Sequence, residues 1–234
     1  MSQVLAVFDL DYTLIEADCE IRWSDYLHDL GIVDDAFMRK IHRFDLDYVE
    51  GHLNYFDFDR TLLSPLLPIN KATCDMLLKD YLPLLRPHIR PWMMDVVESH
   101  RRAGHRTVLA TASNSYLAES IAKMLGFTDL VCTTVVMVDG KPTGEIVGEP
   151  AFREGKVRKL QQFVRDLNVS FEQSYAYSDS HNDIPLLELV GHPVAVTPDP
   201  LMSVHAKKHD WQIIKHPEGY TRSKWTTGNE AIAP

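Results

Sequence analysis

The stretch VLAVFDLDYT (residues 4–13) decides the fold, because an unbroken apolar run leads directly into two aspartates. A short apolar run without polar alternation is typical of a strand that is buried on both faces of a parallel sheet. Asp9 and Asp11 follow at the carboxyl end of that strand, where open α/β sheets bind their ligands. The stretch therefore predicts a central parallel strand with an acidic pair at its functional end.

Apolar runs of the same kind recur along the chain, and helical patterns separate several of them. The further strands that we expect are residues 106–110, 130–134, 174–177, 193–196 and 211–214. The helices expected between them are residues 92–103, 116–125 and 154–167, with Gly104 and Gly126 at the ends of the first two. This alternation predicts an α/β fold, a Rossmann-like parallel sheet with helices on both faces. Residues 135–147 differ and predict a hairpin that turns at Asp139 and Gly140.

Residues 16–85 interrupt the alternation, because their patterns are helical only. The helices expected there are residues 19–30, 35–55 and 71–82. We expect an all-α domain of residues 16–85, inserted between the first two strands of a core made of residues 1–15 and 86–234. The polar tail from about residue 217 predicts a loop or a frayed end.

The composition is that of a globular protein and argues against several functions. The 234 residues are 45% hydrophobic and 24% charged, which suffices for a core without disulfides. A net charge of −9 argues against a nucleic-acid partner, because phosphate backbones require concentrated Lys and Arg. Three widely spaced cysteines suit a reduced, cytoplasmic setting. No apolar stretch approaches about 18 residues and the first residues lack a signal-peptide pattern, so we expect no membrane partner.

Polar residues follow the expected strands at one edge of the sheet. Of Asp9 and Asp11, one can attack as a nucleophile or bind a metal while the other moves a proton. Thr111, followed by Ala112 and Ser113, stands between a strand and a helix start, where a hydroxyl and backbone N–H groups can bind phosphate. An ordinary helix cap at Ser113 or Asn114 is the simpler interpretation of that motif alone.

A lysine and a second acidic pair complete the set. Lys156 near a helix start can act as a point charge on phosphate. Asp179 and Asp183 bracket a turn after another strand and suit Mg²⁺, although they can also simply cap the next helix near Asn182. We expect His181 to be an exposed loop residue. Because four aspartates at one edge would repel one another, a bound Mg²⁺ is their expected companion.

Other common motifs have less support. No Walker A loop, GxGxxG motif or GxSxG elbow occurs in the sequence. Asp9, Asp11, Thr13 and Glu20 match positions 1, 3, 5 and 12 of a calcium-binding EF-hand loop, but Leu14 stands where that loop requires glycine. A strand also precedes these residues where an EF-hand has a helix.

In their order and position these motifs resemble those of haloacid-dehalogenase-type phosphatases. That family carries DxDx(T/V) after the first strand, Thr or Ser after the second, a Lys, and a (G/S)D-x3-D loop. The matching residues here are Asp9, Asp11, Thr13, Thr111, Lys156, Asp179 and Asp183. The helical insertion resembles the C1-type cap of the phosphoserine-phosphatase-like branch.

The resemblance implies a division of labour between the aspartates. Asp9 would attack phosphorus and form an aspartyl-phosphate, and Asp11 would protonate the leaving oxygen and then activate water. Mg²⁺ would be held by Asp9, Asp179 and the backbone carbonyl of Asp11, with Asp183 orienting the metal shell.

The resemblance also implies phosphate-binding residues. Thr111 and Lys156 would bind the phosphoryl oxygens with Asn182 nearby, beside Ala112 and Ser113 of the second motif. The last motif reads SDSHND rather than the GDGxND of phosphoserine phosphatases, which puts phosphoserine itself in doubt as the substrate.

Substrate choice is expected to reside in the cap. By spacing, Asp18 fits the family's amine-binding acid better than Glu20, and Arg60 can bind a carboxylate or phosphate. For Glu20 and Arg60 a plain surface location is the simpler interpretation. We expect a Mg²⁺-dependent phosphatase, monomeric or homodimeric, acting on a small phosphorylated metabolite such as histidinol phosphate or phosphoserine. Phosphotransfer to an alcohol and non-catalytic binding of a phosphorylated ligand remain alternatives.

Overall fold

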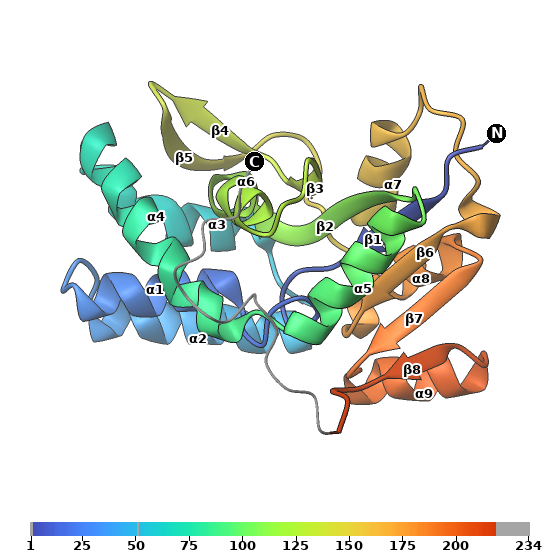
Figure 1. Cartoon of the computed structure of the whole chain (residues 1–234). Helices are drawn as coiled ribbons and strands as arrows, with labels where there is room; N and C mark the ends of the chain where they lie inside the picture. Colours follow the sequence, from blue (N-terminus) through green and yellow to red (C-terminus); the bar gives the residue numbers. More distant parts are fainter. Residues whose placement is uncertain (1, 51, 219–234) are drawn as a thin grey trace.

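The computed structural model describes residues 2–50 and 52–218 (Figure 1). A parallel sheet in the strand order β3-β2-β1-β6-β7-β8 forms its centre. The strands are β1 (Leu5–Phe8), β2 (Arg106–Asn114), β3 (Asp129–Thr133), β6 (Tyr175–Ser178), β7 (His192–Val196) and β8 (Gln212–Ile214). The predicted parallel α/β sheet is confirmed, although β2 runs four residues past the expected end at Ala110.

Helices cover both faces of the sheet, as the sequence predicts. The side chains of β1 alternate, so that Ala6 and Phe8 belong to one hydrophobic cluster and Leu5 and Val7 to the other. The first cluster includes side chains of α5 (Pro91–Arg102) and α6 (Ser115–Met124). The second includes side chains of α7 (Glu154–Phe163), α8 (Ile184–Leu189) and α9 (Pro200–Lys208). Burial on both faces explains why β1 has no polar alternation.

Helix α7 ends at Phe163, which is four residues earlier than the sequence pattern predicts. The chain turns after Phe163 because Val169 must reach the sheet, where it forms a parallel bridge with Gln3. The apolar residues between Phe163 and Val169 therefore continue the helical spacing of the sequence, although the helix has ended.

The predicted hairpin is confirmed as β4 (Val135–Val138) and β5 (Lys141–Ile146). Asp139 and Gly140 at its turn both have positive φ, 50° and 73°, as a two-residue turn matched to the strand twist requires. The hairpin packs on the helical insertion, since Lys141 Nζ donates to the Leu67 carbonyl at 2.9 Å. A Cβ on Gly144 would lie only 2.9 Å from Arg60 Cα, so glycine permits this close approach.

Residues 16–85 form helices beside the sheet (Figure 1). Their helices are α1 (Cys19–Asp29), α2 (Asp35–Val49), α3 (Tyr55–Leu63) and α4 (Lys71–Leu85), with 3₁₀ turns at Ser64–Leu66 and Arg86–His88. The predicted single helix over residues 35–55 is wrong. Asn54 caps a new helix by accepting bonds from the N–H groups of Phe56 and Asp57, and this cap replaces continued helix.

One hydrophobic cluster joins the insertion to the sheet, because Trp23, Leu62 and Leu77 belong to the same cluster as Phe8. None of the helices in the described ranges is long and apolar enough to cross a membrane. The tail predicted as a loop lies outside the described residues from residue 219 onward.

Candidate active site

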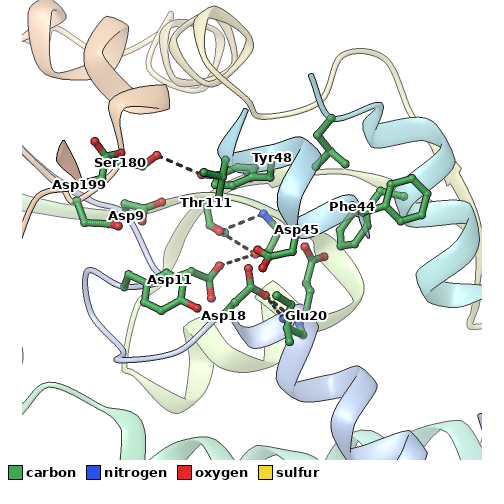
Figure 2. Close-up of a pocket in the computed structure, with 18 of the residues that line it drawn as sticks. Asp9, Asp11, Asp18, Glu20, Phe44, Asp45, Tyr48, Thr111, Ser180 and Asp199 are labelled. Carbon is green, nitrogen blue, oxygen red and sulfur yellow. Dashed lines mark hydrogen bonds between the residues drawn. The ribbon is translucent and has the colours of Figure 1, made fainter. Parts of the chain in front are cut away.

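The motif residues meet at the carboxyl edge of the sheet. Asp9 follows β1, Thr111 lies near the end of β2, and Asp179 follows β6. From β1 the chain continues to β2 and β3 on one side, and later strands add on the other, which creates a crevice where such sheets bind ligands. These three residues line one cavity of about 460 Å³ between the sheet and the helical insertion (Figure 2).

Lys156 pairs with two aspartates at the floor of the site. Its Nζ lies 3.0 Å from Asp9 Oδ1 and 2.8 Å from Asp183 Oδ2, and Ser178 Oγ donates to the same Asp183 oxygen at 2.7 Å. Burial alone would lower the pKa of Lys156, but Asp183 and Asp9 raise it, so that the ammonium stays charged. Burial raises the pKa of Asp9 to about 6 although the Lys156 charge opposes this. The sequence signal for Lys156 was weak because its partners lie far away in the chain.

Asp11 lies in a different environment, without a cation. Its Oδ1 accepts the N–H of Cys19 at 2.7 Å, and its Oδ2 accepts the Ser113 hydroxyl at 2.8 Å. Burial, followed by the charges of Asp18 and Asp9, raises the pKa of Asp11 to about 8. A carboxyl group that keeps its proton near neutral pH can act as a general acid.

The second motif lies beside Asp11. Thr111 Oγ1 donates to Ser113 Oγ at 3.1 Å. Ser113 was expected to bind substrate, but its hydroxyl is held by Asp11. Ala112 lines the cavity, and the predicted cap is Asn114, whose side chain accepts the N–H of Leu117.

Asp179 is the acid that suits a metal together with Asp9. Its Oδ1 accepts the Thr13 hydroxyl at 3.0 Å, and Thr13 Oγ1 accepts the Asp179 N–H at 3.0 Å. Burial and then the Asp9 charge raise the pKa of Asp179 well above its usual value. Within residues 2–50 and 52–218, no lysine or arginine forms an ion pair with it. The two carboxylates therefore repel one another across the cavity, which is the situation that a divalent cation relieves.

The side chains of the other two predicted metal residues are engaged elsewhere. Asp183 is held by Lys156 and Ser178, and Asp11 by Cys19 and Ser113. Accordingly, the described part of the chain contains no group of three or more His, Cys, Asp or Glu side chains placed to hold a metal ion. Mg²⁺ commonly binds through one or two carboxylates and keeps several waters, so Asp9, Asp179 and a backbone carbonyl fit it.

His181 was expected to be exposed in a loop, and this is wrong. It lines the cavity, its side chain is only 18% exposed, and its Nδ1 lies 2.8 Å from Asp199 Oδ2. The His181 N–H donates to the same oxygen at 2.7 Å. Asp199 also caps α9. The sequence around Asp199 indicates a helix start but does not indicate that His181 is its partner. The adjacent Asn182 is buried, and its Oδ1 accepts a bond from Arg153 at 2.9 Å.

Asp18 faces the cavity from the start of α1. As the helix cap, it accepts the N–H groups of Glu20 and Ile21 at 2.8 and 2.9 Å. Burial and then the charge of Asp45, on α2, raise the pKa of Asp18. Asp18 and Asp45 both line this cavity (Figure 2).

A surface location is wrong for Glu20, which is only 6% exposed and lines the cavity. Its Oε1 accepts the backbone N–H of Asn114 at 2.9 Å as well as the Asn114 side-chain amide. The same amide donates to Asp59 Oδ1 at 3.0 Å, so one asparagine links α1, α3 and the end of β2.

Arg60, by contrast, does not reach the site, and its assignment as a substrate-binding residue is wrong. Its side chain is 63% exposed and lies 3.6 Å from Asp57. The Arg60 backbone packs against the hairpin at Gly144, and Arg60 is not among the residues that line the cavity.

The cavity combines acidic and aromatic walls. Its acids are Asp9, Asp11, Asp18, Glu20, Asp45, Asp179 and Asp199, and its aromatic residues are Tyr12, Phe44, Tyr48, Tyr55 and Phe58. Among the described residues that line it there is no lysine or arginine. Acidic side chains in such a cavity can pair with a positively charged group.

Comparison with known proteins identifies the family. Residues 6–188 match the model of haloacid dehalogenase-like hydrolases. The chain belongs to this hydrolase family. The family and the enzyme class expected from the motifs are thereby confirmed.

Relatives of this haloacid dehalogenase-like hydrolase are found among curated proteins and solved structures. A histidinol-phosphatase of Neisseria meningitidis is 34% identical over 216 residues, which cover 90% of this chain and 97% of the relative. A protein of unknown function from Bordetella pertussis Tohama I has a TM-score of 0.83 at 34% identity, covering 92% of this chain and 99% of that one. A substrate-bound phosphoserine phosphatase has a TM-score of 0.68 at 18% identity, covering 92% and 95%, and this likeness concerns the fold.

Proposed function

We propose that the chain is a Mg²⁺-dependent phosphatase that hydrolyses a small phosphomonoester carrying an ammonium group, through an aspartyl-phosphate. The observation that carries the proposal is the contrast between Asp9 and Asp11. Asp9 is paired with Lys156 and has a pKa raised to about 6, whereas Asp11 lacks a cation and has a pKa raised to about 8. Two neighbouring carboxyl groups whose surroundings push their pKa values apart can divide the roles of nucleophile and acid.

The reaction balances with these two groups. A carboxylate oxygen of Asp9 attacks phosphorus, a new O–P bond forms, and the ester O–P bond breaks. Asp11 gives its proton to the leaving alkoxide, and an alcohol departs. Asp11 then accepts a proton from water, whose oxygen attacks phosphorus and releases phosphate and the Asp9 carboxylate. In this proposal Thr111, which lines the cavity, and Lys156, which is paired with Asp9 beneath it, hold the phosphoryl oxygens during both steps.

The proposed metal residues are Asp9, Asp179 and the backbone carbonyl of Asp11, with Asp183 orienting the shell. Support comes from the like-charge repulsion between Asp9 and Asp179, which no direct lysine or arginine partner of Asp179 relieves within the described ranges. Mg²⁺ bound there supplies neutralisation of the negative charge spread over the phosphoryl group.

The proposed substrate carries an amine. Asp18 is the acid that we propose to bind this amine. It lines the cavity, and the hydrogen bonds that its carboxylate accepts come from backbone N–H groups. Aromatic side chains on α2 and α3 can pack on a ring or an alkyl chain. Histidinol phosphate and phosphoserine are the two candidate esters, and the Neisseria relative named histidinol-phosphatase favours the first.

The domain division is part of the same proposal. Residues 16–85 would act as the cap that reads the alcohol, and residues 1–15 and 86–234 as the catalytic core. We place the enzyme in the cytoplasm as a monomer or homodimer, a setting that suits its free cysteines Cys19, Cys74 and Cys132.

Phosphate release from a panel of esters tests the proposal. The panel contains histidinol phosphate, phosphoserine, phosphoethanolamine and propyl phosphate, each with Mg²⁺ and with chelator, for the wild type and Asp9→Asn. We expect metal-dependent release that favours the cationic esters and is lost in Asp9→Asn. Transfer of phosphate to an added alcohol without free phosphate would assign a phosphotransferase, and stoichiometric binding without turnover would assign a binding protein.

A further inference from the structure

Helix α2 forms a wall of the cavity but is weakly packed. Its residues Ile41, Phe44, Asp45, Tyr48 and Val49 line the cavity. Of the whole helix only Met38 and Ile41 are buried. A segment with little buried apolar surface opens more readily than the core, so α2 needs a further attachment to stay over the site.

Tyr48 supplies that attachment. Its hydroxyl lies 3.4 Å from Ser180 Oγ, and Figure 2 shows it pointing from α2 toward this serine. Its ring lies 5.7 Å from that of Phe152, in the loop before α7. Within residues 2–50 and 52–218, no other α2 side chain hydrogen-bonds to a residue outside the helical insertion.

The attachment ends on the loop that carries the acids of the site. Ser180 lies next to Asp179, its N–H donates to Ser178 Oγ at 3.3 Å, and its Oγ accepts the N–H of Asn182 at 3.2 Å. A serine hydroxyl oxygen has two lone pairs, so Ser180 Oγ can accept the Asn182 N–H and also a bond from the Tyr48 phenol. Burial raises the pKa of Tyr48, so its hydroxyl keeps the proton that it donates.

The position of α2 decides what faces the substrate. Phe44 and Asp45 lie four and three residues before Tyr48, which places them on the same side of the helix. With Tyr48 on Ser180, Asp45 lies near enough for its charge to act on Asp18. Two carboxylates from different parts of the helical insertion then lie close together on the cavity lining.

We propose that Tyr48 is a positioning residue whose bond to Ser180 holds α2 over the cavity and so sets Phe44 and Asp45 against the cationic end of the substrate. The inference gives Tyr48 a role in the substrate specificity of the proposed phosphatase. Its kinetic test therefore rests on the proposed function. Its structural part, the fastening of α2, is independent of the reaction.

Kinetics of Tyr48→Phe, Ser180→Ala and the double variant test the role in specificity. Histidinol phosphate is the ester with a cationic ammonium group, and propyl phosphate is the ester without one. Loss of one hydrogen bond should lower the ratio of their kcat/KM values about 3- to 10-fold, through KM of the cationic ester. The double variant should lose no more than Ser180→Ala, because Ser180→Ala already removes the bond to Tyr48. Tyr26→Phe removes a phenol hydroxyl from α1 and should leave the ratio as in the wild type.

Amide hydrogen exchange tests the fastening of α2 without any substrate. Exchange over residues 35–49 should quicken about 3- to 10-fold in Tyr48→Phe and in Ser180→Ala, while residues 71–85 and the Tyr26→Phe control keep wild-type exchange. Unchanged exchange of residues 35–49 in both variants would overturn the inference. A wild type that hydrolyses no ester, together with faster exchange in the variants, would instead overturn the phosphatase proposal and leave the fastening intact.

Discussion

The ammonium of Lys156 lies between the carboxylates of Asp9 and Asp183, 3.0 Å from Asp9 Oδ1 and 2.8 Å from Asp183 Oδ2. The lysine side chain is 3% exposed, and those of Asp9 and Asp183 are 10% and 5% exposed. One charge on α7 thereby compensates two acids that come from the ends of β1 and β6. Its removal should affect the fold as well as the reaction.

Lys156→Met should destabilise the protein, because it leaves two buried carboxylates without their cation. We expect a loss of about 3 kcal/mol in the free energy of unfolding, measured by urea denaturation at neutral pH. Lys159→Met, one turn further along the same helix and only half-buried, is the control and should change stability by less than about 0.5 kcal/mol. Equal stability of the two variants would show that Lys156 is not needed to compensate the acids.

Ser113→Ala tests whether this serine positions Asp11 or binds substrate. Its hydroxyl lies 2.8 Å from Asp11 Oδ2, so we expect kcat to fall roughly tenfold with little change in KM. The sequence alone assigns Ser113 to substrate binding, and that role would instead raise KM at constant kcat. Steady-state kinetics with the best ester of the panel separates the two results.

The sequence predicts those parts of the site that depend on local pattern. The strand before Asp9 and the one before Asp179 are visible because burial on both faces leaves short apolar runs without alternation. Family motifs then place Thr111 and Lys156 at the same edge. None of this requires knowledge of how the helices pack.

The parts that could not be predicted depend on distant partners. Glu20 is buried because Asn114, far along the chain, donates to it, and His181 is ordered by Asp199 at the start of another helix. Arg60 has an exposed side chain, although its backbone lies against the distant hairpin at Gly144. Residue spacing carries no record of these contacts, so the same residue types could equally be surface or site groups.

Stability should depend on pH through His100. It is 7% exposed, its Nε2 lies 2.8 Å from Tyr177 Oη, and its Nδ1 lies 2.8 Å from His105 Nδ1. Burial, and then the His105 charge, lowers its pKa to about 4. Between about pH 6.5 and pH 4 the unfolded chain therefore binds a proton that the folded chain does not. The contribution of His100 to the stability of the fold therefore falls as the pH falls from about 6.5 to about 4.

The measurement compares the wild type with His100→Gln, because buried carboxyl groups with raised pKa values act in the opposite direction in both proteins. Between pH 7 and pH 5 the wild type should lose about 2 kcal/mol of unfolding free energy relative to the variant. Urea denaturation at the two pH values gives the difference. A parallel dependence in both proteins would contradict a neutral His100 in the fold.

Asp18→Asn separates the charge of Asp18 from its role as a helix cap. Asparagine caps helices as well as aspartate does. The new side chain should therefore still accept the N–H groups of Glu20 and Ile21, and the protein should keep its stability. The variant loses the negative charge that faces the cavity beside Asp45. We therefore expect KM for histidinol phosphate to rise about tenfold while KM for propyl phosphate changes less than about twofold. Arg60→Ala, whose side chain points into solvent, should leave both values unchanged. An equal rise in KM for the two esters would show that the effect of Asp18 does not depend on the amine, and the amine would then have to be held by Asp45 or Glu20.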